Sequence, residues 1–409
     1  MNVKIKLILM EIIVLILFSF SLIFSFDKQY VLLVSFDGFR WDYLNRGITP
    51  NLEKIRNEGV YALSLRPAFP TKTFPNHYTL VTGMFPENHG IISNSILNPF
   101  SNERYRIGDT VAVRNHIWYK GEAIWETANR NGIKSASFFW VGSEQNLPIK
   151  QPTYFYHYDH NLPYIKRIEG VIEWLKLPDD KRPQLITLYF DEPDSKAHRF
   201  GTNSKETNEA IAMVDSMVGI LIYKLNEIGW DNKINLILVS DHGMTDIDEE
   251  RRINIEEILK DYKCKFDGTG PVMMIDVERN KVEEVYQVLK KNEKNYRVYK
   301  KENIPSYYNF SKYPFIFPII VIADVGWSLV DNNFLSRSTS YSLKANHGYE
   351  KDHLDMHGIF IAKGPAFRKG YKTGTLWNID VYPLICKILS IEPNHLIDGD
   401  LNRIEFILK

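Results

Sequence analysis

Short apolar runs alternate with longer amphipathic stretches along most of the chain. The runs are rich in β-branched and aromatic residues and are bounded by turn residues, as β-strands are; they span Tyr30–Phe36, Lys134–Phe139, Leu185–Phe190, Ile234–Val239, Val272–Ile275 and Ile359–Ala362. Between two of them, apolar residues recur at spacings of three and four, which predicts a helix with one apolar face: Ala210, Ile211, Val214, Met217, Val218, Leu221, Ile222 and Leu225. This alternation predicts an α/β fold with a mainly parallel central sheet and helices on both faces.

Residues 264–330 break the alternation. They contain a predicted helix at Lys281–Asn292 and an aromatic, proline-bearing stretch at Ile304–Phe317. We therefore expect a smaller inserted subdomain over about residues 264–330. The chain shows no internal repeat, low-complexity segment or linker rich in Gly, Ser or Pro, which favours one domain over residues 27–409.

The first 26 residues form a segment of their own. Lys4 and Lys6 precede a run that stays apolar to Phe26 apart from one glutamate and three serines, the charge order of a secretory signal. No small residues mark a cleavage site before Asp27, and residues 7–26 are long enough to cross a bilayer as a helix. A signal peptide and a membrane anchor therefore both stay open. In either case the positive-inside rule places the body outside the cytoplasm, so we expect a secreted, periplasmic or membrane-anchored protein.

The composition is that of a globular chain without a global electrostatic bias. The 409 residues are 44% hydrophobic and 24% charged, which excludes disorder. Lys plus Arg and Asp plus Glu number 50 each, so the net charge gives no sign of a nucleic-acid-binding surface. Two cysteines, Cys264 and Cys386, are too few for a disulfide framework, and whether they form one bridge stays open.

Acidic residues follow three of the predicted strands. Asp37 follows the first strand directly, Asp194 comes four residues after the third, and Asp241 comes two residues after the fourth. Each alone is typical of a turn or a helix N-cap. However, the carboxyl ends of strands in an α/β sheet meet at one edge, where ligand sites form. We therefore expect the three carboxylates to converge.

Histidines accompany these carboxylates at the spacing of metal ligands. His198 is four residues after Asp194, so both side chains share one face of a helical turn, and His242 directly follows Asp241. Further candidates lie downstream at His347, His353 and His357. Aspartate and histidine without thiolates suit Zn²⁺, and Mn²⁺, Fe or Co²⁺ fit the same ligand types. These residues are numerous enough to hold two metal ions.

A candidate nucleophile, Thr73, precedes an apolar helical pattern. With Pro75 two residues on, Thr73 is predicted to be the N-cap of that helix, with proline in its first turn. A hydroxyl at a helix N-terminus lies in a positive field, and a metal ion beside it would lower its pKa toward the alkoxide that attacks phosphorus. The capping and catalytic interpretations are compatible.

Six motifs follow one another in the chain. They are Thr-Lys-Thr-Phe-Pro-Asn-His-Tyr at 71–78, Val-Thr-Gly at 81–83, Pro-Glu-Asn-His-Gly-Ile at 86–91, Glu-Pro-Asp at 192–194 with His198, Ser-Asp-His-Gly-Met at 240–244 and Met-His-Gly-Ile-Phe at 356–360. Together they resemble the nucleotide pyrophosphatase/phosphodiesterase family of the alkaline phosphatase superfamily, over about residues 30–400. The resemblance implies an alkaline phosphatase-like fold and a metal-dependent hydrolase with two Zn²⁺ per chain.

The resemblance also implies roles for individual residues. By motif position, one zinc is assigned to Asp194, His198 and His357, and the other to Asp37, Asp241, His242 and the hydroxyl of Thr73. Thr73 would be the nucleophile and form a phosphothreonine intermediate. Asn94 matches an asparagine that donates a hydrogen bond to a phosphoryl oxygen, and Phe74 and Tyr158 match aromatics that flank a nucleotide base. The run around Tyr158 departs from the usual Pro-Tyr pair.

The implied function is that of an extracytoplasmic two-zinc phosphodiesterase/pyrophosphatase with its catalytic domain at residues 27–409. It would hydrolyse phosphodiester or phosphoanhydride bonds of small-molecule nucleotides, such as ATP to AMP and pyrophosphate. A choline- or phospholipid-type phosphodiesterase and a phosphomonoesterase fit the same metal core and stay open, as does the oligomeric state. A binding protein on a decayed enzyme scaffold would have lost ligands, whereas all the implied ligands are present.

Overall fold

The computed structural model of the protein describes residues 28–336 and 343–409. In this part of the chain the largest sheet has eight strands. From edge to edge they are β19 (Tyr371–Thr373), β2 (Val60–Ala62), β18 (Phe360–Lys363), β9 (Ile234–Val239), β1 (Tyr30–Phe36), β8 (Leu185–Phe190), β6 (Ser135–Phe138) and β7 (Tyr154–Tyr156). All neighbours pair in parallel except β18, which is antiparallel to both β2 and β9. The predicted mainly parallel α/β fold is confirmed.

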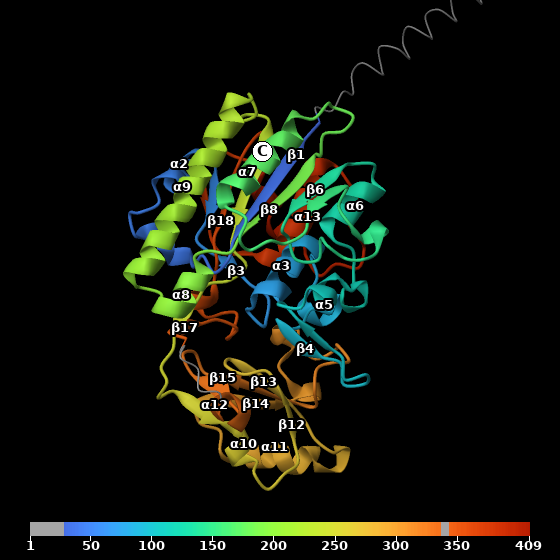
Figure 1. Cartoon of the computed structure of the whole chain (residues 1–409), viewed down its shortest axis with the longest axis vertical. Helices are drawn as coiled ribbons and strands as arrows, with labels where there is room; N and C mark the ends of the chain where they lie inside the picture. Colours follow the sequence, from blue (N-terminus) through green and yellow to red (C-terminus); the bar gives the residue numbers. More distant parts are fainter. Residues whose placement is uncertain (1–27, 337–342) are drawn as a thin grey trace, which may run out of the picture.

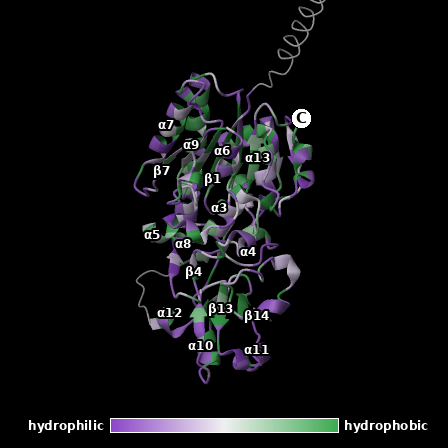
Figure 2. Ribbon diagram, turned by 90° about the vertical axis from the view of Figure 1, so that its right-hand side faces the viewer, coloured by the Kyte–Doolittle hydropathy of each residue, from purple (hydrophilic) through white to green (hydrophobic). Residues whose placement is uncertain are grey.

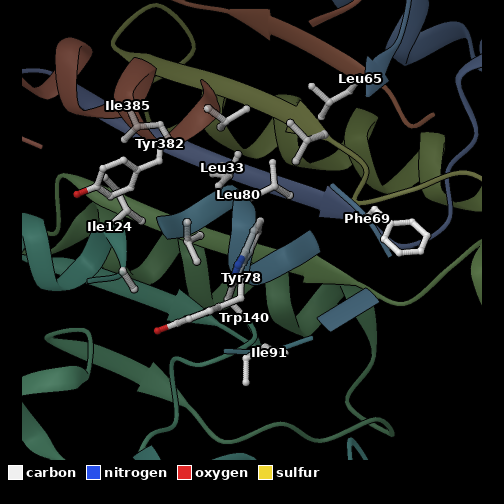
Figure 3. Close-up of a cluster of buried hydrophobic side chains, with 14 of the residues drawn as sticks. Leu33, Leu65, Phe69, Tyr78, Leu80, Ile91, Ile124, Trp140, Tyr382 and Ile385 are labelled. Carbon is white, nitrogen blue, oxygen red and sulfur yellow. The ribbon is translucent and has the colours of Figure 1, made fainter. Parts of the chain in front are cut away.

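Helices cover both faces of this main sheet (Figure 1). Successive residues of β1 point to opposite faces. Val31 and Leu33 belong to a core shared with α3 (Thr73–Thr82), α6 (Ile124–Arg130) and α13 (Val381–Leu389). Leu32 and Val34 belong to the other core, shared with α2 (Pro50–Glu58), α7 (Tyr164–Lys176) and α9 (Lys205–Glu227). Figure 3 shows the first core, and Figure 2 shows hydrophobic residues gathered in the strands between the helical layers.

The predicted apolar stripe lies on α9 and faces the sheet. Six of its eight residues are buried, whereas Met217 and Ile222 are partly buried at its border. The predicted strands agree with β1, β8 and β9 residue for residue and with β6 and β18 to within one residue. The predicted strand at Val272–Ile275 forms too, as β13, but it belongs to a different sheet.

A second sheet lies beyond the carboxyl ends of the main strands, at the bottom of Figure 1. Its four antiparallel strands are, in order, β12 (Lys265–Asp267), β13 (Val272–Asp276), β15 (Ile319–Ala323) and β14 (Tyr296–Lys300). Helix α11 (Val282–Lys291) packs on it through Val285 and Leu289. These elements fall within residues 264–330, for which a subdomain is expected, and the domain boundary itself stays a prediction.

Shorter elements connect and border the two sheets. The helices are α4 (Pro86–His89), α5 (Thr110–Arg114), α8 (Asp194–Phe200), α10 (Ile255–Ile258) and α12 (Asn332–Ser336). The strands are β3 (Leu65–Arg66), β4 (Ser95–Leu97), β5 (Arg104–Arg106), β10 (Thr245–Asp246), β11 (Arg252–Asn254), β16 (Ser328–Val330), β17 (Ala345–Asn346) and β20 (Leu376–Trp377). They form four two-stranded ladders: β4 with β5, β10 with β17, β11 with β16 and β3 with β20.

The sequence left open whether the chain has a membrane-spanning helix and whether its two cysteines are bonded. Within residues 28–336 and 343–409, no helix combines the length and the hydropathy needed to cross a bilayer. Residues 1–26, for which a signal peptide or an anchor is predicted, lie outside the described residues. Cys264 and Cys386 are both free thiols in the structure, and Cys386 is buried.

Asp215, on α9, holds the N-terminus of α2 against the sheet. Its carboxylate is buried and accepts hydrogen bonds from the amides of Asn51 and Leu52 at 3.2 and 2.8 Å, and from the Asn51 side chain at 2.8 Å. The residue at the N-cap of α2, Thr49, makes no side-chain capping bond. Asp215 therefore caps α2 from a neighbouring helix.

We predict that Asp215→Ala lowers the free energy of unfolding by about 2–3 kcal/mol, because one buried and one partly buried amide at a helix N-terminus lose a charged acceptor. Urea denaturation of the variant measures the loss. Glu209→Ala, an exposed change on the same helix, is the control and should shift stability by less than about 0.5 kcal/mol. Equal denaturation midpoints for the two variants would show that Asp215 does not cap α2.

Candidate active site

The acidic residues that follow three main strands meet at one edge of the sheet. Asp37 is the first residue after β1, Asp194 begins α8 after β8, and Asp241 follows β9. Because β1 lies between β8 and β9 in parallel register, the three carboxyl ends are level. The Asp194 amide donates a hydrogen bond to the Asp37 carbonyl oxygen at 3.1 Å, which ties two of the loops together.

Gly38 allows these loops to approach one another. Its φ of +64° lies in the left-handed region that favours glycine. A Cβ atom at this position would lie 2.9 Å from the Asp194 side chain. A larger residue would therefore push Asp194 away from Asp37.

One group of side chains surrounds Thr73. Nε2 of His242 lies 3.1 Å from Asp241 Oδ2, 3.4 Å from Asp37 Oδ1 and 3.2 Å from Thr73 Oγ1. All four side chains are buried. The structure thus brings together the four residues that the resemblance assigned to one metal ion.

A second group adjoins the first at the ring of His242. Nε2 of His198 lies 3.5 Å from one carboxylate oxygen of Asp194, and Nε2 of His347 lies 3.7 Å from the other. The ring of His347 stacks on that of His242 with centroids 3.6 Å apart. One ligand atom each of Asp194, His242 and His347 lies within 4.8 Å of the others. The two groups are therefore neighbours at the floor of one site.

The three histidines of these groups share one hydrogen-bonding pattern. Nδ1 of His198, His242 and His347 each lies 2.8 Å from a backbone carbonyl oxygen, that of Ala345, Gly243 and Thr71 respectively. A carbonyl only accepts hydrogen bonds, so each Nδ1 carries a hydrogen and each Nε2 faces the carboxylates. Histidines that bind metals are held in this way through their other nitrogen.

Two carboxylate oxygens in these groups lack a hydrogen-bond donor among the described residues. Asp194 Oδ1 and Asp241 Oδ2 are buried and accept no hydrogen bond from the part of the chain that the structure describes. Burial, and then the charges of Asp241 and Asp194, raise the pKa of Asp37 well above its usual range. Burial also lowers the pKa of His242 and of His347. Because buried carboxylates are costly without a partner, this set of oxygen and imidazole donors fits a divalent cation such as Zn²⁺ in each group.

His357, assigned from the sequence as the third ligand beside Asp194 and His198, does not join them. Its Nε2 donates to the Lys351 carbonyl oxygen at 3.0 Å, and its Nδ1 accepts from the Ser64 hydroxyl at 2.9 Å. Neither ring nitrogen is free to bind a metal. His347 lies in the group instead, because β17 ends just before it and pairs with β10, which follows His242 closely. The structure corrects this assignment.

Thr73 is the first residue of α3 rather than its N-cap, which corrects the predicted cap. Lys72 takes the N-cap position without a side-chain capping bond. Asn76 instead bonds three backbone groups between residues 68 and 72 and so fixes the chain before the helix. The Thr73 hydroxyl is therefore available to the group, and it lies 3.5 Å from Asp37 Oδ1.

A cavity of about 510 Å³ opens over both groups, with walls that include Asp37, Thr73, Phe74, Asn94, Tyr158, Asp194, His198 and His347. We call it the nucleophile cavity. Oδ1 of Asn94 accepts a hydrogen bond from the Phe74 amide at 3.0 Å, which leaves its Nδ2 donor without a partner among the described residues. Phe74 and Tyr158 both line the cavity, and 44% of the Tyr158 surface is exposed.

Two further residues contact the site and were not singled out in the sequence. The Tyr189 hydroxyl donates to Asp37 Oδ2 at 2.6 Å. Nδ1 of His77 lies 2.9 Å from the Thr73 carbonyl oxygen and 3.2 Å from Asp241 Oδ2. The spacing of four residues between Thr73 and His77 on one helix is a signal that indicates His77. Tyr189 lies within the apolar run of β8, where no pattern distinguishes it.

Comparisons with known proteins agree with this geometry. The sequence model of the family described as type I phosphodiesterase/nucleotide pyrophosphatase matches residues 31–350. Human ectonucleotide pyrophosphatase/phosphodiesterase family member 5 is 39% identical over 377 residues, which cover 91% of this chain and 77% of that protein. Family member 1 of Mus musculus is 36% identical over 393 residues, which cover 93% of this chain and 43% of that protein. The chain thus spans less than half of some relatives that it matches.

Solved structures are similar over most of the chain. A structure of murine ectonucleotide pyrophosphatase/phosphodiesterase 5 superposes with a TM-score of 0.87 and 35% sequence identity. The match covers 93% of this chain and 100% of the murine chain. The murine protein in that structure is an inactive threonine-to-alanine variant in complex with AMP. The human protein 5 has a TM-score of 0.85 and 36% identity over the same shares.

We predict that His347→Ala lowers the affinity for Zn²⁺ by at least about a hundredfold, since loss of a partner behind a ligand alone costs 10–100-fold. His357→Ala should leave the affinity unchanged within about threefold, because its ring nitrogens are occupied by Ser64 and Lys351. Competition with a chromophoric chelator measures both affinities. If His357→Ala instead lowers the affinity for Zn²⁺ more than His347→Ala does, His357 is the ligand.

The raised pKa of Asp37 makes the stability of the metal-free protein depend on pH. The pKa of Asp37 is raised in the folded protein, so its contribution to stability is complete below about pH 4 and is lost as the pH rises. In chelator-treated protein, Asp37→Asn removes this dependence, and the variant should gain stability relative to the wild type between pH 4 and 7. Urea denaturation across this range measures the difference. A difference that does not change with pH would show that the carboxylates do not repel one another in the folded protein.

Proposed function

The chain belongs to the type I phosphodiesterase/nucleotide pyrophosphatase family and is a hydrolase, and from this premise we propose that it is an extracytoplasmic two-zinc enzyme that cleaves nucleotides through Thr73. The observation that carries the proposal is the pair of adjoining carboxylate–imidazole groups beside the Thr73 hydroxyl. The substrate would be a phosphodiester or phosphoanhydride such as ATP, cleaved to AMP and pyrophosphate. The catalytic domain would span residues 27–409.

In this proposal each group holds one zinc ion. Asp194, His198 and His347 hold one, and Asp37, Asp241 and His242 hold the other together with the Thr73 hydroxyl. Support comes from the Nε2 atoms that face the carboxylates and from the buried carboxylate oxygens that accept no hydrogen bond from the described residues. Bound zinc would lower the pKa of the Thr73 hydroxyl and offset the negative charge of the phosphoryl oxygens.

The proposed reaction has two steps. In the first, Thr73 Oγ loses its proton and forms a bond to phosphorus as the bond to the leaving oxygen breaks, which gives a phosphothreonine ester. In the second, water splits this ester, so the hydroxyl goes to phosphorus and Thr73 regains a proton. Nδ2 of Asn94 donates to a phosphoryl oxygen in both steps, because its Oδ1 is held by the Phe74 amide.

The aromatic walls of the nucleophile cavity suit a nucleoside. A base between Phe74 and Tyr158 would gain about 1–3 kcal/mol per stacking contact. The AMP bound to the inactive murine relative supports a nucleoside in this cavity, and the threonine replaced there supports a threonine nucleophile. The apolar residues 7–26, after two lysines, support a position outside the cytoplasm.

We predict that the zinc-loaded protein converts ATP to AMP and pyrophosphate and that Thr73→Ala lowers the rate at least about a thousandfold, because the nucleophile is lost. Phosphorus NMR of the reaction identifies the products. Thr373→Ala, on the edge strand β19, is the matched control and should keep full activity. ADP with orthophosphate would instead indicate a monoesterase, and an unchanged rate in Thr73→Ala would exclude Thr73 as the nucleophile. If ATP is not cleaved, choline and lipid diesters are the next substrates to test.

A further inference from the structure

A second cavity adjoins the nucleophile cavity at Asn94, which lines both. It measures about 640 Å³ and lies between the β4–β5 hairpin and the second sheet. One wall is the hairpin of β4 and β5, and the other includes the turn Gly268–Thr269 between β12 and β13 of the second sheet. A diester or anhydride carries two substituents on phosphorus. With a nucleoside in the aromatic cavity, the second cavity is the space left for the other substituent.

The hairpin turns two arginines toward this second cavity. Side chains alternate along β5, so Arg104 and Arg106 share one face while Tyr105 takes the other. Tyr105 is buried against Phe74 with ring centroids 6.2 Å apart, whereas both arginines line the second cavity. Ser95 of β4 pairs with Arg106 in the ladder and lines the cavity as well.

The two arginines differ in their partners. Arg104 forms an ion pair with Asp267 at 2.6 Å and donates to the Ser95 hydroxyl at 3.0 Å, so it fastens the hairpin to the second sheet. Arg106 is exposed, and its side chain makes no hydrogen bond or ion pair within residues 28–336 and 343–409. The guanidinium group of Arg106 is therefore free for a ligand.

The charges around the second cavity favour an anion. The side chain of Lys72 also lines it, and its positive charge interacts with the negative charge of Asp194. Of the two acidic residues in its wall, Asp267 is paired with Arg104, and Asp331 accepts the Phe334 amide at the start of α12. Arg106 and Lys72 therefore add positive charge to the cavity that Asn94 lines, whereas both carboxylates of its wall are already bonded.

We infer that the second cavity is a subsite for an anionic group on the leaving side of the substrate, with Arg106 as its principal contact. The inference rests on the proposed function, because it places the reacting phosphorus between Thr73 and Asn94. A guanidinium group binds phosphate oxygens through two parallel N–H groups, which suits the pyrophosphate part of a nucleoside triphosphate. A choline leaving group, which is cationic, would be repelled by Arg106 and Lys72.

The test compares two nucleotide substrates in wild-type protein and in Arg106→Gln. ATP leaves pyrophosphate, whereas the p-nitrophenyl ester of thymidine 5′-monophosphate has a leaving group without phosphate. We expect kcat/KM for ATP to fall roughly tenfold, the loss of one charge-assisted contact, and kcat/KM for the ester to change less than twofold. Arg279→Gln, an exposed change at a residue that does not line the cavity, is the matched control. Equal losses for both substrates, or none, would overturn the inference.

Binding of pyrophosphate separates this inference from the proposed function, because it requires no turnover. Isothermal titration of the zinc-loaded protein should give a dissociation constant that is roughly tenfold larger in Arg106→Gln, and the difference should shrink at high salt. If the wild type cleaves neither substrate but shows this difference, the subsite stands and the proposed function fails. If it cleaves both substrates and binds pyrophosphate equally with and without Arg106, the function stands and the subsite fails.

Discussion

The convergence of three carboxylates after adjacent strands, two of them buried and one partly buried, is the constraint on which the rest of the site depends. Asp37, Asp194 and Asp241 lie close together, and the Nε2 atoms of His198, His242 and His347 face them because each Nδ1 is held by a backbone carbonyl. Such an arrangement is unfavourable in the protein alone and becomes favourable when cations bind. The two cores on either face of the main sheet hold β1, β8 and β9 in register. Their packing offsets the cost of holding the three carboxylates close together.

Different parts of the molecule line the nucleophile cavity and the second cavity. The carboxylates and histidines come from loops at the edge of the main sheet, whereas the second sheet contributes the far wall of the cavity that contains Arg104 and Arg106. Asn94 lies at the junction of the two cavities and is fixed by the Phe74 amide. If the proposed subsite holds the leaving group, changes in the β4–β5 hairpin or in the turn Gly268–Thr269 would alter the preferred leaving group without moving Asp37, Asp194 or Asp241.

Much of this arrangement could be predicted from the sequence, because it follows from local patterns. The strands β1, β8 and β9 are continuous apolar runs that end in acidic residues, and their level carboxyl ends follow from parallel pairing. His347 could not be distinguished from His357 in the same way. Its position depends on β17, a strand of two residues, and on which nitrogen of each ring is hydrogen-bonded. The antiparallel direction of β18 and the place of β13 in a second sheet depend likewise on long-range pairing that no local pattern encodes.

The central claim is that two cations lie between the carboxylates and the histidines beside Thr73. Anomalous X-ray scattering at the zinc edge, from crystals of the zinc-loaded protein, locates such ions directly. The account predicts two peaks, one among Asp194, His198 and His347 and the other among Asp37, Asp241, His242 and Thr73. A peak bound by His357, or no peak at either group in crystals that contain zinc elsewhere, would contradict it.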